Sequence, residues 1–255
     1  MTAKAVAPRE FEDLLTPVGR RILSGTADVC GALVDPRRRF LALEGIITKG
    51  KAEALRRALE ARLLPLLTPM AMPIPPETIW EMEQDYEEWL PKTARVRTAY
   101  LERKRSAAYQ EAQAMGLIDL LRSESLAVFA EKISGRKLDR RNGQQALCYS
   151  PGDYAGPHND HHPENKRAAS GYLDVHLSLS ASSVAHQYLV YAKGGHFTEM
   201  LPVHGLGTLT IYRLPFWHYT TPLQAKSGQE DRARRWVLLA TYLFAAEKKS
   251  TGKSA

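Results

Sequence analysis

Four side chains that can bind a transition metal stand within five residues of this chain, namely His158, Asp160, His161 and His162, after a Gly-Pro turn. The side chains of an extended segment alternate between its two faces, so the imidazole of His158 and the carboxylate of Asp160 are expected on the same side. Placed in this way, the two groups can bind one metal ion. His161 and His162 are then expected to lie beside the metal or to contact a substrate.

A second histidine from a later strand would complete the site, and we predict His218. It directly follows the apolar segment 207–213, and the stretch between Asp160 and His218 leaves room for intervening strands. Two histidines and one carboxylate form a facial triad that leaves adjacent positions on the metal open, a geometry typical of non-haem Fe(II) oxygenases. The predicted ligands are therefore His158, Asp160 and His218. The competing histidines are His176, His186, His196 and His204.

Basic residues precede the last apolar segment of the chain. Arg232, Arg234 and Arg235 stand directly before Trp236. A basic side chain that enters a buried strand is costly unless it is paired. The guanidinium of Arg235 could be matched by the distal carboxylate of a dicarboxylic cosubstrate, through two parallel hydrogen bonds. The alternative is that the three arginines are only a charged lead into the strand.

The composition indicates a globular protein with a real core, because 44% of its 255 residues are hydrophobic and 25% are charged. No apolar run approaches the roughly 18 residues that span a bilayer. The N-terminus lacks the apolar segment of a secretory signal, and two cysteines give no disulfide framework, so a cytoplasmic location is expected. The net charge of +7 comes from basic residues that are spread along the chain, which does not favour a nucleic-acid partner.

The first 140 residues are expected to be mainly helical and to pack on the C-terminal part of the chain. Residues 51–67 have leucines at a spacing of four with charges between them, as an amphipathic helix requires. After a proline-rich stretch, residues 78–114 are predicted to form a long charged helix. Residues 123–132 are predicted to form a short helix that ends near Gly135.

From residue 144 the pattern changes to short segments rich in β-branched and aromatic residues, separated by Gly and Pro turns. Such spacing is typical of a sandwich or barrel. The fold class is therefore α+β: a jelly-roll core over residues 141–247, a helical N-terminal half packed on it, and a frayed tail over 248–255. The predicted strands are residues 144–149, 172–180, 187–192, 207–213 and 235–244.

One set of residues over 144–245 forms a recognisable pattern: Tyr149, Gly152, Tyr154, Pro157, His158, Asp160, Gly194, Gly195, His218, Arg235 and Trp236. Through these residues, the region resembles the Fe(II)/2-oxoglutarate-dependent dioxygenases, in particular the prolyl-4-hydroxylase-like branch. The interval between His218 and Arg235 is longer than is usual in that family, which leaves the choice between Arg234 and Arg235 open. The Gly194-Gly195 pair is followed by His-Phe-Thr rather than the family's usual residues.

The resemblance implies a double-stranded β-helix core that uses Fe(II), 2-oxoglutarate and O₂. It implies hydroxylation of an unactivated C–H bond of an amino acid, a peptide or a natural product, with release of succinate and CO₂. The presence of Asp160 favours hydroxylation over halogenation. By the same resemblance, the 2-oxoglutarate contacts would be Tyr149 and Arg235, with Arg234 and Thr220 as further candidates, and the substrate contacts would be Tyr154 and His162.

Two alternatives remain open from the sequence. Glu164 follows His158 at the spacing of the first cupin motif, so a cupin-type metalloenzyme could use His158, Glu164 and His218 without 2-oxoglutarate. The second cupin motif is poorly matched around His218. In the other alternative, the chain is a non-catalytic β-barrel that binds a partner through its helical half. The oligomeric state is not indicated by the sequence.

Overall fold

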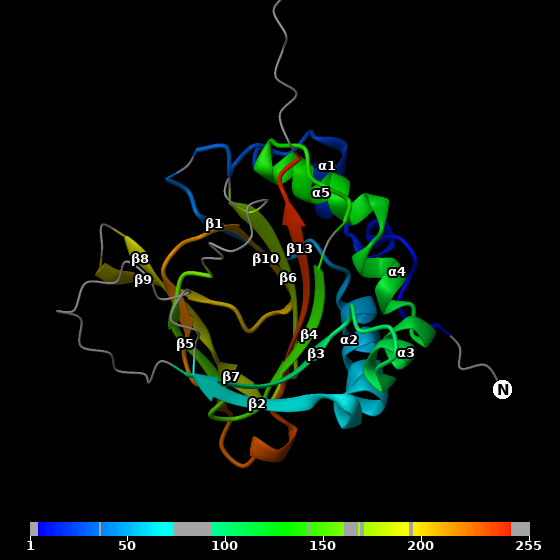
Figure 1. Cartoon of the computed structure of the whole chain (residues 1–255), viewed down its shortest axis with the longest axis vertical. Helices are drawn as coiled ribbons and strands as arrows, with labels where there is room; N and C mark the ends of the chain where they lie inside the picture. Colours follow the sequence, from blue (N-terminus) through cyan, green and yellow to red (C-terminus); the bar gives the residue numbers. More distant parts are fainter. Residues whose placement is uncertain are drawn as a thin grey trace, which may run out of the picture.

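The structure of the protein is a computed structural model that describes residues 5–35, 37–73, 93–141, 143–160, 168, 171–193 and 196–245. Its main element is an antiparallel sheet that curls into an incomplete barrel (Figure 1). Along the sheet the strands follow the order β1 (Phe40–Leu43), β10 (Leu206–Leu214), β6 (Tyr172–Ser180), β13 (Arg235–Leu243), β4 (Gly143–Tyr149), β3 (Thr93–Tyr100), β5 (Tyr154–His158), β11 (His218–Thr220), β8 (Tyr188–Lys193) and β9 (His196–Pro202). β2 (Thr68–Pro73) pairs with β3, and β7 (Val184–His186) pairs with β12 (Gln224–Ala225).

Helices cover the outer face of the curled sheet on the side of β3, β4 and β13 (Figure 1). Three of them begin at a hydroxyl residue that accepts a hydrogen bond from the first turn, namely Thr16, Ser106 and Ser123. The helices are α1 (Pro17–Ser24), α2 (Lys49–Ala58), α3 (Ala107–Ala114), α4 (Leu117–Leu121) and α5 (Glu124–Ser134). The shorter helical turns are Phe11–Leu14, Leu59–Leu63, Leu64–Leu66 and Glu230–Arg232.

Strand alternation separates an apolar outer face of the sheet from a polar inner face. On β6 the side chains of Leu177 and Leu179 pack into one core with the helices, together with Trp236 of β13. The intervening Ser178 faces the other way and contacts the guanidinium of Arg235. The inner face of the barrel therefore holds buried polar groups that the helices do not reach.

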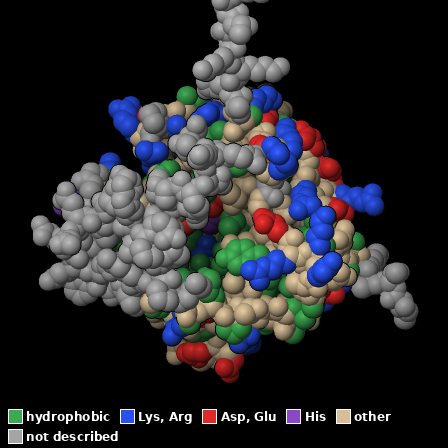
Figure 2. All heavy atoms as spheres, in the orientation of Figure 1, with side chains coloured by type: hydrophobic (Ala, Val, Ile, Leu, Met, Phe, Trp, Pro, Cys, Tyr) green, Lys and Arg blue, Asp and Glu red, His purple; other side chains and the backbone are tan. Residues whose placement is uncertain are grey.

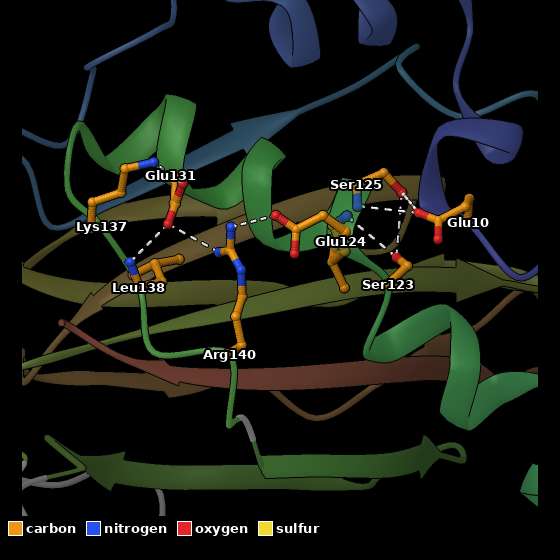
Figure 3. Close-up of polar contacts among 9 residues, drawn as sticks. Glu10, Ser123, Glu124, Ser125, Glu131, Lys137, Leu138 and Arg140 are labelled. Carbon is orange, nitrogen blue, oxygen red and sulfur yellow. Dashed lines mark hydrogen bonds and ion pairs between the residues drawn. The ribbon is translucent and has the colours of Figure 1, made fainter.

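Polar contacts join helix α5 to Glu10 near the N-terminus and to the segment that directly follows the helix (Figure 3). The Glu131 carboxylate accepts hydrogen bonds of 3.0 Å from the backbone N–H of Leu138 and from Arg140, and Ser125 Oγ donates to Glu10 at 2.6 Å. Burial opposes ionisation of Glu131, but the hydrogen bonds from Leu138 and Lys137 and the charge of Arg140 outweigh it and hold the pKa of the carboxyl below its usual range. These contacts fix the segments that flank α5.

The prediction of a long helix over residues 78–114 is wrong for residues 93–100 in its central part. Residues 93–100 form β3, in which Val96 and Thr98 are buried and Arg95 and Arg97 are exposed. That alternation is a strand signal, although the same charges also suit the exposed face of a helix. The helix begins only at Ala107, and residues 74–92 lie outside the described part. The helix predicted over 51–67 leaves α-geometry after Ala58, before the proline at position 65.

The other predicted elements are confirmed. The strands expected over 144–149, 172–180, 187–192, 207–213 and 235–244 are β4, β6, β8, β10 and β13, within two residues at either end. The short helix after Ser123 is α5, and Gly135 closes it in the left-handed conformation. Within the described residues, no helix has the length and apolar character needed to cross a membrane.

Candidate metal centre

The side chains of His158, Asp160 and His218 converge on one point of the inner face. One possible ligand atom from each lies within 4.8 Å of the others. The Asp160 carboxylate stands between the two rings, with Oδ1 3.5 Å from His158 Nε2 and Oδ2 3.5 Å from His218 Nε2. In the space-filling view, the surface is hollowed near the centre of the curled sheet (Figure 2).

Pairing of two strands brings the histidines together, and a turn brings the carboxylate. His158 is the last residue of β5 and pairs with His218, the first residue of β11. Asp160 lies beyond the strand with a φ of 55°, in the left-handed region that Asp tolerates better than most residues. We predicted that alternation along one extended segment would bring the Asp160 carboxylate beside His158. The structure instead places the carboxylate there through the left-handed backbone at Asp160, after β5.

Both imidazoles are held in the same tautomer by the backbone. Nδ1 of His158 lies 2.6 Å from the carbonyl of Gly156, and Nδ1 of His218 lies 2.8 Å from the carbonyl of Phe216. A carbonyl only accepts, so each Nδ1 carries the proton and each Nε2 presents a lone pair. Burial lowers the pKa of His218 to about 3, helped by the nearby His158. His218 is therefore a neutral imidazole, the form that binds a metal.

Arg235 lies on the same inner face and is only 2% exposed. Its Nε donates to Ser178 Oγ at 2.7 Å, and Nη1 donates to Gln187 Oε1 at 3.0 Å. In the described part of the chain, no carboxylate pairs with this guanidinium. Burial accordingly lowers the pKa of Arg235 from its usual value. A buried cation with neutral partners is costly unless an anion joins it.

The two neutral partners of Arg235 are themselves fixed. Ser178 Oγ donates to the carbonyl of Val203 at 2.8 Å, so its lone pairs face the guanidinium. The amide nitrogen of Gln187 donates to the carbonyls of Asp153 and Thr221 at 3.2 and 3.0 Å, which turns its oxygen toward Arg235. The guanidinium is thus held in one orientation by two acceptors whose residues already donate to backbone carbonyls.

Of the other predicted cosubstrate contacts, Tyr149 lies next to Arg235, and Thr220 contacts Tyr149. The centre of the guanidinium is 5.4 Å from the ring centroid of Tyr149. Burial raises the pKa of the Tyr149 phenol, although the charge of Arg235 and a hydrogen bond with Thr220 act in the opposite direction. Arg234 points elsewhere, and its guanidinium donates to the backbone carbonyl of Asp231.

The remaining candidates are more scattered. Tyr154 is on β5, the same strand as His158, and its hydroxyl lies 2.7 Å from Thr93 Oγ1 of β3. Among the competing histidines, His176 is on the inner face, His204 contacts the backbone of Gln187, and His186 and His196 are exposed. His161, His162, Glu164 and the Gly194-Gly195 pair lie outside the described residues.

Sequence reasoning did not single out three residues that the site uses, which are Ser178, Gln187 and Tyr172. The Tyr172 hydroxyl donates to the backbone carbonyl of Asp160 at 2.6 Å. Ser178 and Tyr172 share the polar register of the segment 172–180, so its alternation pattern already placed them on one face. Gln187 directly precedes β8, and no motif or alternation pattern in the sequence indicated a role for it.

Comparison with known proteins gives a likeness in structure alone. No protein-family model and no curated protein sequence matches the chain. A 2OG-Fe(II) oxygenase family oxidoreductase from Burkholderia pseudomallei superposes with a TM-score of 0.53 at 14% identity, over 88% of this chain and 90% of the other. A prolyl-4-hydroxylase from Pseudomonas putida gives a TM-score of 0.50 at 12% identity, over 85% and 99% of the two chains. The 2-oxoglutarate-dependent carbocyclase SnoK of nogalamycin biosynthesis gives 0.51 at 14% identity, over 93% and 87%.

The chain has the fold of the 2OG-Fe(II) oxygenases. The predicted jelly-roll core, a double-stranded β-helix with helices packed on it, is confirmed by this likeness and by the curled antiparallel sheet. Within this oxygenase fold, the residues on the inner face fit the two groups in question. Two imidazoles and a carboxylate suit a divalent metal such as Fe(II). A buried guanidinium without an acidic partner among the described residues suits the carboxylate of 2-oxoglutarate.

Proposed function

We propose that this protein is an Fe(II)- and 2-oxoglutarate-dependent oxygenase that hydroxylates a C–H bond of a small-molecule or peptide substrate. The observation that carries the proposal is Arg235. It is a fully buried cation that faces the same interior as His158, Asp160 and His218, and it has only neutral partners among the described residues. An anionic cosubstrate that also binds the metal would satisfy both features.

Each residue has a defined part in the proposed site. His158 Nε2, His218 Nε2 and the Asp160 carboxylate would hold the metal, with the two Nδ1–H groups anchored on backbone carbonyls. Arg235, whose guanidinium is held in place by Ser178, would bind the distal carboxylate of 2-oxoglutarate.

Other residues would shape the same interior. The Tyr149 ring lies against the guanidinium, Thr220 hydrogen-bonds with Tyr149, and both would close the site around the cosubstrate. Phe216, whose ring is stacked on His218 at 4.6 Å, would exclude water on that side.

The bound metal, 2-oxoglutarate and O₂ supply the oxidising chemistry, in which a substrate C–H becomes C–OH while 2-oxoglutarate becomes succinate and CO₂. The protein's own residues contribute binding and orientation of the two reactants and exclusion of bulk water. The substrate would approach from the open side of the interior. Peptide and small-molecule chemistries both occur among the structural neighbours, which include a prolyl hydroxylase in complex with a peptide fragment.

The test is an anaerobic titration followed by visible absorption. A weak charge-transfer band is expected when both Fe(II) and 2-oxoglutarate are present and not with either alone. Asp160→Ala should lose the band, and Glu44→Gln, an exposed carboxylate change outside the barrel, should keep it. If the wild-type protein gives no band, the proposal is wrong.

A further inference from the structure

Three buried polar atoms on the inner face of β6 have no hydrogen-bond partner among the described residues, namely Ser180 Oγ and the pair Asp174 Oδ1 and His176 Nε2. Buried polar atoms in proteins are almost always paired, so such a pair needs an explanation. Asp174 and His176 are two residues apart on one strand, and β6 pairs with its neighbour β13 without a bulge, so both side chains lie on the same face. Neither is needed to hold the metal or to bind Arg235.

Both residues share the interior that contains the candidate metal centre. They continue the register of Ser178, which contacts Arg235. The His176 ring lies 4.3 Å from the ring of Tyr212, and Tyr212 in turn lies 5.5 Å from the ring of His218. One aromatic ring therefore separates His176 from a predicted metal ligand, which places His176 near the candidate metal centre.

The charge of Asp174 is unbalanced. The residue is 8% exposed, and within the described residues its ionisable partner is His176, with Nε2 3.8 Å from Oδ2. That distance is too long for a hydrogen bond. No lysine or arginine of the described residues pairs with the carboxylate. A buried carboxylate without a cation destabilises the folded protein, and a bound positive group would relieve this cost.

We propose that Asp174 and His176 form a subsite that binds a positively charged nitrogen of the substrate, such as a primary ammonium. The inference rests on the proposed function, in which the substrate lies beside this metal centre. The interior would then hold two charged anchors on one wall: Arg235 for the carboxylate of the cosubstrate, and Asp174 for the cation of the substrate. His176 would position the bound nitrogen and shield it from the Tyr212 side.

The test uses n-butylammonium as the probe, with 1-butanol and butyrate as neutral and anionic probes of matched size. Each is added at equal ionic strength to the anaerobic protein loaded with Fe(II) and 2-oxoglutarate, and the thermal unfolding midpoint is measured against probe concentration. The midpoint of the wild type should rise with n-butylammonium and not with the other two. Asp174→Asn should weaken this response by roughly tenfold or more in concentration.

Two variants serve as comparisons. His176→Gln should weaken the response less than Asp174→Asn, because it removes a positioning group and not the charge. Glu44→Gln has the same charge change at an exposed site and should respond as the wild type does. Without probe, Asp174→Asn should unfold at a midpoint no lower than the wild type, because an unpaired buried charge has been removed.

The inference is overturned if n-butylammonium raises the wild-type midpoint no more than 1-butanol does, or if Asp174→Asn responds as strongly as the wild type. The charge-transfer band recorded on the same samples separates this failure from that of the proposed function. A band with no ammonium response removes the subsite alone. Absence of the band in the wild type removes the proposed function, whatever the probe does.

Discussion

The phenol of Tyr172 donates a 2.6 Å hydrogen bond to the backbone carbonyl of Asp160. It joins the first residue of β6 to the left-handed turn that carries the predicted carboxylate ligand. The turn after β5 is thereby held against the strand that lines the inner face. Orientation of a metal ligand by an outer contact of this kind is a common way to set metal affinity.

Tyr172→Phe should therefore weaken Fe(II) binding by roughly tenfold while the protein stays folded. The phenyl ring keeps the packing, and the hydrogen bond to Asp160 is lost. Fe(II) affinity is measured anaerobically by competition with a chelating dye, and far-UV circular dichroism checks the fold. Tyr100→Phe, at a half-exposed site on β3, is the matched control and should bind as the wild type does. If Tyr172→Phe binds Fe(II) as tightly as the wild type does, the hydrogen bond from Tyr172 is not needed to hold the turn at Asp160 in place.

Arg235→Gln should raise the apparent dissociation constant for 2-oxoglutarate by roughly 30-fold or more and leave Fe(II) affinity nearly unchanged, because a buried cation that binds a carboxylate is lost. The neighbouring Arg234→Gln should change neither quantity, since its guanidinium bonds to a backbone carbonyl. Both constants come from the anaerobic titration. A larger effect at Arg234 than at Arg235 would contradict the assignment of the cosubstrate contact.

Asp160→Ala and Glu164→Ala separate the oxygenase from the cupin alternative. With Asp160 as a ligand, its loss should abolish binding of Fe(II) at micromolar concentration, and loss of Glu164 should have little effect. Asp160 converges on both histidines at 3.5 Å, which supports this order of effects. Metal content after anaerobic dialysis gives the answer. The reverse order would favour a cupin-type site.

Acid should destabilise the fold through Glu53 and Glu131. Hydrogen bonds from Arg56 hold the pKa of Glu53 at about 2, below the value of about 4.3 expected in the unfolded chain. A group with a depressed folded-state pKa stabilises the protein above its unfolded pKa, and this stabilisation is lost as the pH falls. The free energy of unfolding should therefore fall between about pH 5 and pH 2.

Glu53→Gln should lower stability at pH 7 by roughly 1 kcal/mol or less and make the fall on acidification smaller, because the pair with Arg56 is partly exposed. Urea unfolding at pH 7 and pH 3.5 measures both effects. Glu44→Gln, at an exposed position that pairs with no cation of the described residues, should leave the pH dependence as it is. The same pH dependence in Glu53→Gln and the wild type would exclude Glu53 as a source of the acid sensitivity.

Sequence reasoning succeeded where one segment carried its own pattern. The alternation over 172–180 predicted β6 with its bounds, and the composition around His158 and His218 predicted residues that the fold brings together. It failed for β3, because the charges of Arg95 and Arg97 suited an exposed helix as well as an exposed strand face. Local pattern cannot decide this without knowledge of the neighbouring strands.

Hydrogen-bond partners that come from distant segments of the chain could not be predicted from the sequence. Ser178 meets Arg235 only because β6 pairs with β13 in one register, and Gln187 reaches the same guanidinium from the start of β8. The left-handed backbone at Asp160 was not predictable from the sequence, because no glycine stands at that position. Such relations depend on strand order and register, which a single sequence does not specify.

The most direct test of the account is a crystal structure grown anaerobically with Mn(II) in place of Fe(II) and with 2-oxoglutarate. The account predicts the metal bound to His158 Nε2, His218 Nε2 and the Asp160 carboxylate, and the distal carboxylate of 2-oxoglutarate hydrogen-bonded to Arg235. A metal at any other set of residues, or 2-oxoglutarate bound away from Arg235, would contradict it.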